Sequence, residues 1–184
     1  MKKEILPENN YLGLIFQKIE RKHLKEWFEY LIIPEFARHT SWDVKNIGDI
    51  ERLEYWYNSF EPDSPIRFAI VDELTNALVG TIGFNSISPL NKSGEVSYDI
   101  APPYWTKGIG TNVCKSMIKW GFFELDFVRI QATVLDTNSA SEKVLLNCGF
   151  CYEGLLRSYR LVRGQPRDYK MYSILRSDVK SIFI

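Results

Sequence analysis

The residues most able to do chemistry stand in the turn Lys107-Gly108-Ile109-Gly110-Thr111. A glycine-rich turn between a strand and a helix exposes backbone N–H groups at the positive end of the helix dipole, where phosphate oxygens bind without any side chain. Gly108 and Gly110 carry no Cβ that would keep a ligand from the backbone, and Lys107 adds a positive charge. An ordinary turn into a helix has the same composition. On its own, the turn leaves both interpretations open.

Three kinds of phosphate site can be compared with this turn. A Walker loop has the pattern G-x-x-x-x-G-K-[ST], which does not occur in the chain. The dinucleotide fingerprint requires a third glycine, but Val113 stands there, and Pro102-Pro103 separates the strand from the turn more than a tight Rossmann crossover allows. A cradle for the pyrophosphate of coenzyme A needs only the two glycines and the start of a helix.

The composition limits the class of protein. With 184 residues, 45% of them hydrophobic and 25% charged, the chain is typical of one soluble globular domain spanning residues 1–184. Its 23 basic and 23 acidic residues give zero net charge, so no basic excess suggests a nucleic-acid partner. The sequence has neither an apolar run long enough to cross a membrane nor a signal peptide. We therefore expect a cytoplasmic protein without nucleic-acid or membrane partners.

The chain has three cysteines, an odd number that fits a reducing compartment better than a disulfide scaffold. Two of them form a C-x-x-C pattern at Cys148 and Cys151. A zinc site would need a second pair of ligands, and His23 and His39 lack metal-like spacing. We interpret the two cysteines as partly buried thiols and expect no metal.

The elements that must position these residues follow from hydrophobic periodicity and turn residues. Helices are predicted at Arg21–Leu31, Asp49–Phe60, Thr111–Phe123 and from Ser139 to Gly149. Strands are predicted at Leu12–Lys18, Arg67–Asp72, Leu78–Phe84, Glu95–Ile100, Ile130–Leu135, Tyr152–Tyr159 and Tyr169–Ile174. This order indicates a single mixed α/β or α+β domain.

The helix that begins near Ser139 has clear end signals. Ser139-Ala140-Ser141-Glu142 matches a capping box, with Ser139 as the N-cap and Glu142 reaching back. Gly149 supplies a left-handed residue that closes the helix.

The stretch from Glu95 to Thr111 resembles the cofactor-binding region of the GNAT acetyltransferase superfamily, and more narrowly the branch of the ribosomal-protein N-terminal (alanine/serine) acetyltransferases. The resemblance extends to residues 77–84, 138–141, 148–150, 153–157 and 163–169. It implies a GNAT-like domain with a mostly antiparallel, twisted sheet of about seven strands, splayed around the cofactor and flanked by about four helices. Trp105 and Thr106 depart from the superfamily pattern at the start of the turn, although Trp105 is common in the branch.

The resemblance also implies acetyl-CoA as co-substrate. The pyrophosphate of acetyl-CoA would bind the backbone of the glycine turn. Its pantetheine arm would pair with the strand Glu95–Ile100 like an added edge strand. Asn138 resembles the asparagine that bonds the pantetheine, although supporting the N-cap at Ser139 explains it nearly as well. The expected cofactor-binding residues are Tyr98, Asp99, Ile100, Lys107, Gly108, Ile109, Gly110, Thr111 and Asn138.

Acetyl transfer to an amine requires a proton donor for the leaving thiolate and removal of a proton from the amine. Leu145 occupies the position of the donor tyrosine of many superfamily members, and this branch uses a serine one helical turn earlier, here Ser141. Glu95 stands where some members carry a catalytic glutamate. Ser141 as a plain first-turn residue, Glu95 as a solvated strand end, and proton loss through water remain open alternatives.

The acceptor amine is expected under the early helices and the last hairpin, which are rich in aromatic residues, including Trp42, Tyr159 and Tyr169. Most of these rings are expected to belong to the core. Trp42 and Tyr159 are the candidate substrate contacts, and Asp43 could attract a cationic amine. The predicted function is N-acetylation of a primary amine, most simply a protein N-terminus, by a monomer or homodimer. Acetylation of a polyamine, amino sugar or antibiotic, and a non-catalytic acyl-CoA-binding module, are the alternatives.

Overall fold

The computed structural model describes residues 6–9, 11, 13–58, 61 and 63–181. Leu12 and Phe60, the predicted ends of the first strand and the second helix, lie outside the described residues.

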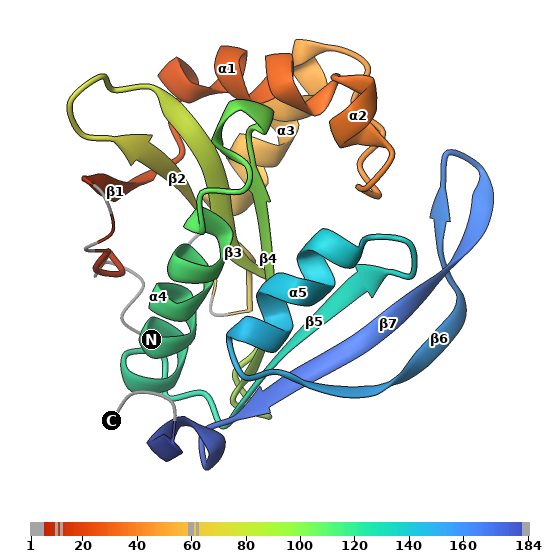
Figure 1. The fold of residues 1–184 in the computed structure, drawn as a ribbon. Coiled ribbons are helices and arrows are strands. Elements are labelled where there is room, and N and C mark those ends of the chain that lie inside the picture. Colours follow the sequence, from red (N-terminus) through yellow and green to blue (C-terminus); the bar gives the residue numbers. More distant parts are fainter. Residues whose placement is uncertain (1–5, 10, 12, 59–60, 62, 182–184) are drawn as a thin grey trace.

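Seven strands form one mixed sheet in the order β1-β2-β3-β4-β5-β7-β6, shown in Figure 1. All neighbouring strands are antiparallel except β4 and β5, which are parallel. The mostly antiparallel sheet of the prediction is therefore confirmed. The strands are β1 (Leu14–Lys18), β2 (Ile66–Asp72), β3 (Leu78–Ser88), β4 (Ser93–Ile100), β5 (Arg129–Leu135), β6 (Cys151–Val162) and β7 (Gln165–Leu175).

Five α-helices and two 3₁₀ helices complete the described part of the chain. They are α1 (Arg21–Leu31), α2 (Pro34–Ala37), α3 (Ile47–Tyr57), η1 (Pro102–Tyr104), α4 (Ile109–Phe123), α5 (Ser139–Asn147) and η2 (Asp178–Ser181). The short helix α2 was not predicted. Pro34 ends α1 as expected, but it also occupies the first turn of α2, where proline's missing N–H has no helical partner to lose.

The sheet has a hydrophobic core on each face. Alternation along β2 divides its side chains, with Phe68 and Ile70 packed under α4 and α5, and Ala69 and Val71 packed under α1, α2 and α3. On β4, Val96, Tyr98 and Ile100 face the α4 side. The opposite face of β4 therefore presents Glu95, Ser97 and Asp99 toward the early helices.

The sheet splays open between its two parallel strands. Only three residue pairs join β4 to β5, and the last of them is Glu95 with Gln131. Beyond this point the strands diverge, while α4 and α5 lie along one side of the opening (Figure 1). Backbone N–H and C=O groups that face the opening lack a partner strand, so they are available to a ligand.

The predicted capping box at the start of α5 is wrong. The N-cap is Asn138 rather than Ser139, and the Asn138 side-chain oxygen accepts a hydrogen bond from the backbone N–H of Ser141 at 3.1 Å. Glu142 does not reach back to the cap, because it pairs with Lys170 at 2.8 Å and accepts a hydrogen bond from Tyr172. Asparagine is at least as good an N-cap as serine, and here it precedes serine by one residue. The predicted left-handed conformation of Gly149 is confirmed, with φ of 87°.

Candidate active site

The glycine turn caps the start of α4. Gly108 is the N-cap residue and has a left-handed backbone, with φ of 75°, which glycine adopts without steric cost. The helix begins at Ile109, two residues before the predicted start, and a backbone hydrogen bond runs from the Asn112 N–H to the Gly108 carbonyl. The N–H groups of residues 109–111 consequently have no acceptor within the helix, which is the arrangement that binds an anion. The turn is held from outside by Tyr11, whose hydroxyl donates to the Lys107 carbonyl at 2.7 Å.

Gly110 is a glycine that the protein's own packing does not require. A Cβ at this position would come no closer than 3.4 Å to its nearest neighbour, Cγ2 of Val144, which is an ordinary van der Waals contact. Glycine stabilises a helix less than alanine does, by about 1 kcal/mol in a helix interior and by less near an end. The absence of a side chain is explained if a ligand approaches the backbone here, because a Cβ would stand between them.

A cavity of about 690 Å³ lies along the opening between β4 and β5. Most predicted site residues line it: Trp42, Glu95, Tyr98, Asp99, Ile100, Gly108, Ile109, Gly110, Thr111, Asn138 and Ser141. Lys107 and Tyr159 do not line it. Lys107 instead extends over the ring of Tyr104 at 5.2 Å, and Tyr159 is 43% exposed beside Tyr169.

The backbone of β4 presents its polar groups to this cavity at alternate residues. Ala101 donates its N–H to the Val79 carbonyl of β3 at 2.9 Å. Because antiparallel pairing alternates, Asp99 likewise directs its backbone toward β3, whereas Tyr98 and Ile100 direct theirs toward the opening. The Ile100 carbonyl already accepts a bond from Trp105 Nε1 at 2.6 Å. The N–H of Tyr98 is therefore well placed to bind a ligand that enters the opening.

Ser141 lies in the first turn of α5, on the wall of the cavity. Its backbone is fixed from two sides, since its N–H bonds Asn138 and its carbonyl accepts the Tyr98 hydroxyl at 3.2 Å. Asn138 also donates its side-chain N–H to the His39 carbonyl at 3.3 Å. Asn138 thus caps α5 and also connects α5 to the segment after α2 by a hydrogen bond.

Glu95 is not a solvated strand end. Its residue is 8% exposed, and its Oε1 accepts hydrogen bonds from Thr133 Oγ1 at 2.8 Å and from Arg160 Nη2 at 2.9 Å. Arg160 comes from β6 and lies over the rings of Tyr159 and Tyr169, at 5.2 and 5.4 Å. The Glu95 carboxylate is consequently an oriented group inside the cavity, with its charge compensated by Arg160.

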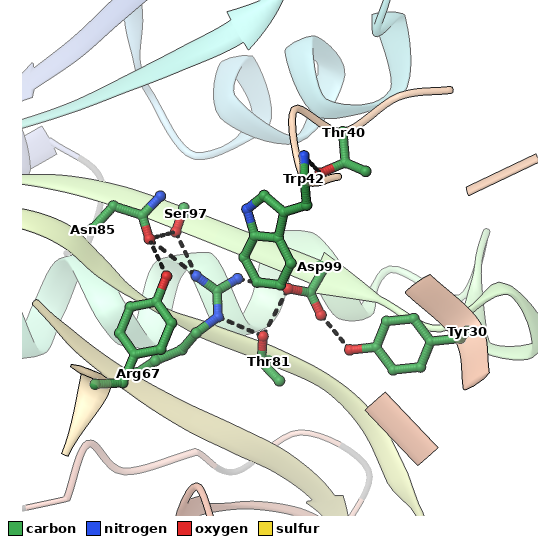
Figure 2. A network of polar contacts seen from close by, with 9 residues as sticks. Tyr30, Thr40, Trp42, Arg67, Thr81, Asn85, Ser97 and Asp99 are labelled. Atoms are coloured by element: carbon green, nitrogen blue, oxygen red, sulfur yellow. Dashed lines mark hydrogen bonds and ion pairs between the residues drawn. The ribbon is translucent and has the colours of Figure 1, made fainter. Parts of the chain in front are cut away.

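A second carboxylate of the cavity, Asp99, belongs to a buried network centred on Arg67, shown in Figure 2. The Arg67 guanidinium donates to Asp99 Oδ2 at 2.6 Å and to Thr81 Oγ1 at 2.6 Å. Its remaining donors reach Ser97 Oγ at 2.8 Å and Asn85 Oδ1 at 3.1 Å. Tyr30 donates to the other oxygen of Asp99. The network also lies against aromatic rings, of which Trp42 is at 4.9 Å from the guanidinium carbon.

These contacts show why Trp42 lines the cavity: it covers Arg67. Burial raises the pKa of Tyr30 well above its ordinary value, and the neighbouring Asp99 carboxylate adds to the rise, so this phenol stays protonated and keeps donating. Asp43 is not among the lining residues and pairs with Lys45 at 3.3 Å on the surface. The predicted contribution of Asp43 to the acceptor site therefore has no geometric support.

Comparison with known proteins agrees with this geometry. Residues 13–151 match the family model described as acetyltransferase (GNAT) domain. The chain belongs to the GNAT acetyltransferase family. The uncharacterized N-acetyltransferase YoaA of Bacillus subtilis is 30% identical over 167 residues, which cover 89% of this chain and 93% of the relative.

Two solved structures share the GNAT fold. The spermidine N-acetyltransferase of Vibrio cholerae, solved with CoA and spermine, has a TM-score of 0.78 at 22% identity and covers 90% of this chain and 97% of its own. RimL, a ribosomal L7/L12 alpha-N-protein acetyltransferase solved with coenzyme A, has a TM-score of 0.82 at 16% identity and covers 93% and 98%.

This GNAT protein is an N-acetyltransferase, and acetyl-CoA is its co-substrate. The residues present fit that molecule, since α4 offers unpaired N–H groups beside a glycine without a packing role, and the opening of the sheet exposes strand backbone. Within the described ranges, no group of three metal-ligating side chains comes together, and no helix is long and apolar enough to span a membrane.

The Arg67 network was missed from sequence. The residues next to Arg67 in β2 are apolar. The hydrogen-bond partners of Arg67 come from the strands β3 and β4. The one available signal is a charged residue inside the predicted strand Arg67–Asp72, which implies a buried partner without naming it.

Proposed function

We propose that this enzyme transfers the acetyl group of acetyl-CoA to the α-amine of a protein N-terminus, by direct attack in a ternary complex. The observation that carries the proposal is the balance of charge in the cavity, whose described lining has no unpaired carboxylate and includes one further basic residue, Lys143. Of its described lining residues only Glu95 and Asp99 are acidic, and each is paired with an arginine that also lines it, Arg160 or Arg67.

This balance favours an acceptor with one positive charge over an acceptor with several. A polyamine brings further ammonium groups, and burying each of them requires an unpaired carboxylate. The N-terminus of a peptide with a small neutral first residue brings one amine, and the rest of the chain is neutral at that end. The cavity therefore suits a peptide amine.

We assign the chemical roles as follows. Glu95, oriented by Thr133 and Arg160, accepts the proton of the attacking amine, directly or through water. The Tyr98 N–H polarises the thioester carbonyl from the opening of the sheet. Ser141, on the facing wall, protonates the thiolate of coenzyme A as it leaves. The glycine turn and Lys107 hold the pyrophosphate, and Asn138 bonds the pantetheine.

Polyamine acetylation is the second candidate, because the chain shares its fold with a spermidine N-acetyltransferase and is 26% identical to one over 136 residues. For that substrate Arg160 would have to leave Glu95 so that the carboxylate could bind an ammonium group. Removal of the Arg160 charge therefore tests whether this pairing is what keeps an ammonium group from Glu95.

The test is acetyl-CoA turnover, followed by thiol release, with alanyl and seryl peptides and with spermidine as acceptors. We expect the wild type to acetylate the peptides with a kcat/KM well above that for spermidine. Arg160→Gln should raise kcat/KM for spermidine by about tenfold or more, because Glu95 becomes an uncompensated carboxylate that attracts ammonium groups.

Arg157→Gln is the matched control, because Arg157 is exposed on the same strand, does not line the cavity and changes the net charge equally. It should leave both acceptors unaffected. A wild type that prefers spermidine to the peptides would contradict the proposal and support the second candidate.

We also propose that residues 1–184 form one catalytic domain in the cytoplasm. The seven strands of the described residues make one sheet, and all three cysteines are free thiols, as is common in a reducing compartment.

A further inference from the structure

The hydroxyl of Tyr169 is a buried polar group without a partner. Tyr169 stands in β7 and is 4% exposed, and its oxygen makes no hydrogen bond with any described residue. A buried hydroxyl left without a hydrogen bond destabilises the folded protein, so such groups are rare in native proteins and call for an explanation.

Tyr169 lines the cavity, on the same face of the sheet as Glu95. Its strand pairs Tyr169 with Leu135 and Met171 with Thr133, and Thr133 donates to Glu95. Side chains two residues apart on a strand share a face. Tyr169 is therefore on the wall that faces the acceptor, two positions along from the Glu95 contact.

The ring of Tyr169 is fixed without help from its hydroxyl. It packs with Leu135 and Val162, and the Tyr159 ring lies edge-on at 5.8 Å. A phenylalanine would make the same contacts without the unpartnered oxygen. The hydroxyl is explained if a bound ligand supplies the missing partner.

The neighbouring charge indicates what kind of atom this partner is. The Arg160 guanidinium carbon lies 5.4 Å from the Tyr169 ring centroid. This positive charge opposes a second ammonium group near the ring and favours an atom with partial negative charge. A carbonyl oxygen accepts a hydrogen bond and carries such a charge, whereas a polyamine has no oxygen.

Another orphaned atom of the cavity, His39 Nδ1, lies elsewhere on the wall. The carbonyl of His39 accepts from Asn138, the cap of α5, so His39 belongs to the cofactor side. Of the partnerless buried atoms on the described lining, the Tyr169 hydroxyl is therefore the one on the β7 wall, beside Arg160.

We infer that the Tyr169 hydroxyl donates a hydrogen bond to the first carbonyl oxygen of the acceptor peptide and so selects amines that carry a neighbouring carbonyl. This inference rests on the proposed function, because it assigns a specificity residue to the same site. Tyr169 thereby distinguishes an aminoacyl group from an alkylamine of similar size.

The experiment compares wild type, Tyr169→Phe and the control Tyr152→Phe. Tyr152 is a 54% exposed tyrosine of the same hairpin and is not a lining residue. The readouts are kcat and KM for an alanyl peptide, the inhibition constant of 2-aminopentane against that peptide, and the thermal midpoint without ligand.

Tyr169→Phe should raise KM for the peptide about tenfold with kcat little changed, because the lost bond is made equally in the ground and transition states. The inhibition constant of 2-aminopentane, which has no carbonyl, should stay the same. The thermal midpoint should not fall, because the hydroxyl that is removed had no partner in the free enzyme. Tyr152→Phe should match the wild type in all of these readouts.

An unchanged KM for the peptide in an active Tyr169→Phe enzyme would overturn this inference and leave the proposed function intact. A lower thermal midpoint would also overturn it, because the hydroxyl would then have a structural partner. If the wild type fails to acetylate any α-amine, the proposed function fails as well, and the two failures are told apart by the wild-type data.

Discussion

A substitution at Gly110 can test ligand binding without disturbing the fold. Gly108 cannot do so, because its left-handed backbone strains any other residue whether or not a ligand is present. At Gly110 the space for a methyl group exists, and the nearest contact would be 3.4 Å.

Gly110→Ala is therefore expected to leave stability unchanged or to raise it by about 0.5–1 kcal/mol, since alanine favours the helix. The added methyl group should lower the affinity for coenzyme A about tenfold or more, a loss of about 1.4 kcal/mol. Titration calorimetry and thermal unfolding measure the two effects separately. Unchanged affinity would mean that the pyrophosphate lies elsewhere.

Ser141 offers a second residue-scale prediction. If its hydroxyl protonates the leaving thiolate, Ser141→Ala should lower kcat by about 10²-fold or more while the Kd for acetyl-CoA stays the same. Steady-state turnover and calorimetry measure these quantities. Ser139→Ala is the matched control, because Ser139 is exposed in the same helical turn and does not cap it. Full turnover by Ser141→Ala would show that the Ser141 hydroxyl does not protonate the thiolate.

Most of the single residues predicted for the site lie close together in the fold. Residues 108–111 of the glycine turn line one cavity together with Ser141, Asn138 and Glu95. Their motifs are local, so each could be found from its own neighbours in the sequence. The partners that fix their chemistry are not local: Arg160 is 65 residues from Glu95, and Thr133 is 38.

At the scale of elements, one ion pair and a hydrogen bond to it connect side chains of three neighbouring strands. Arg129 of β5 donates to both carboxylate oxygens of Glu153 on β6, at 2.8 and 2.5 Å. Ser173 of β7 donates to the same carboxylate at 2.6 Å. These bonds to Arg129 and then Ser173 lower the pKa of Glu153 from 4.5 to about 2.

A lowered pKa means that the folded state favours the carboxylate more strongly than the unfolded state does. The stabilisation is fully present above pH 4.5 and is lost as the pH falls toward 2. The Glu153 side chain is 38% exposed, so solvent screening reduces the effect.

Glu153→Gln should therefore destabilise the protein at pH 7, and its stability deficit relative to wild type should shrink between pH 4.5 and 2. Chemical denaturation at several pH values measures the difference. Glu124→Gln, an exposed residue at the end of α4, serves as control and should show no such dependence. A deficit that does not change with pH would mean that the carboxylate charge is unimportant.

The ends of elements were harder to predict than their existence. The helix α1 was predicted with its observed bounds because its apolar spacing and Pro34 define both ends. The N-cap of α5 was misplaced by one residue because Asn138 and Ser139 are both good caps, and only the three-dimensional hydrogen bond decides between them. The short helix α2 has too few residues for periodicity to reveal it.

At the scale of the whole molecule, sequence predicted the order of the elements and the mixed sheet but not its internal balance of charge. A net charge of zero could arise from any scatter of 23 basic and 23 acidic residues. The structure places two of the resulting ion pairs inside one cavity, from residues of β2, β4 and β6. Such pairing depends on which strands are neighbours, and composition contains no information about that.

The opening between β4 and β5 has a consequence for the lifetime of the protein. Three residue pairs join the two halves of the sheet there, so a molecule bound in the opening contributes attractions that the chain itself lacks. By mass action, a ligand that binds only the native form at a hundred times its Kd adds about 2.7 kcal/mol to the free energy of unfolding. The supply of acetyl-CoA would then govern turnover and also resistance to proteolysis, so that starvation for the metabolite would reduce the abundance of the enzyme that consumes it.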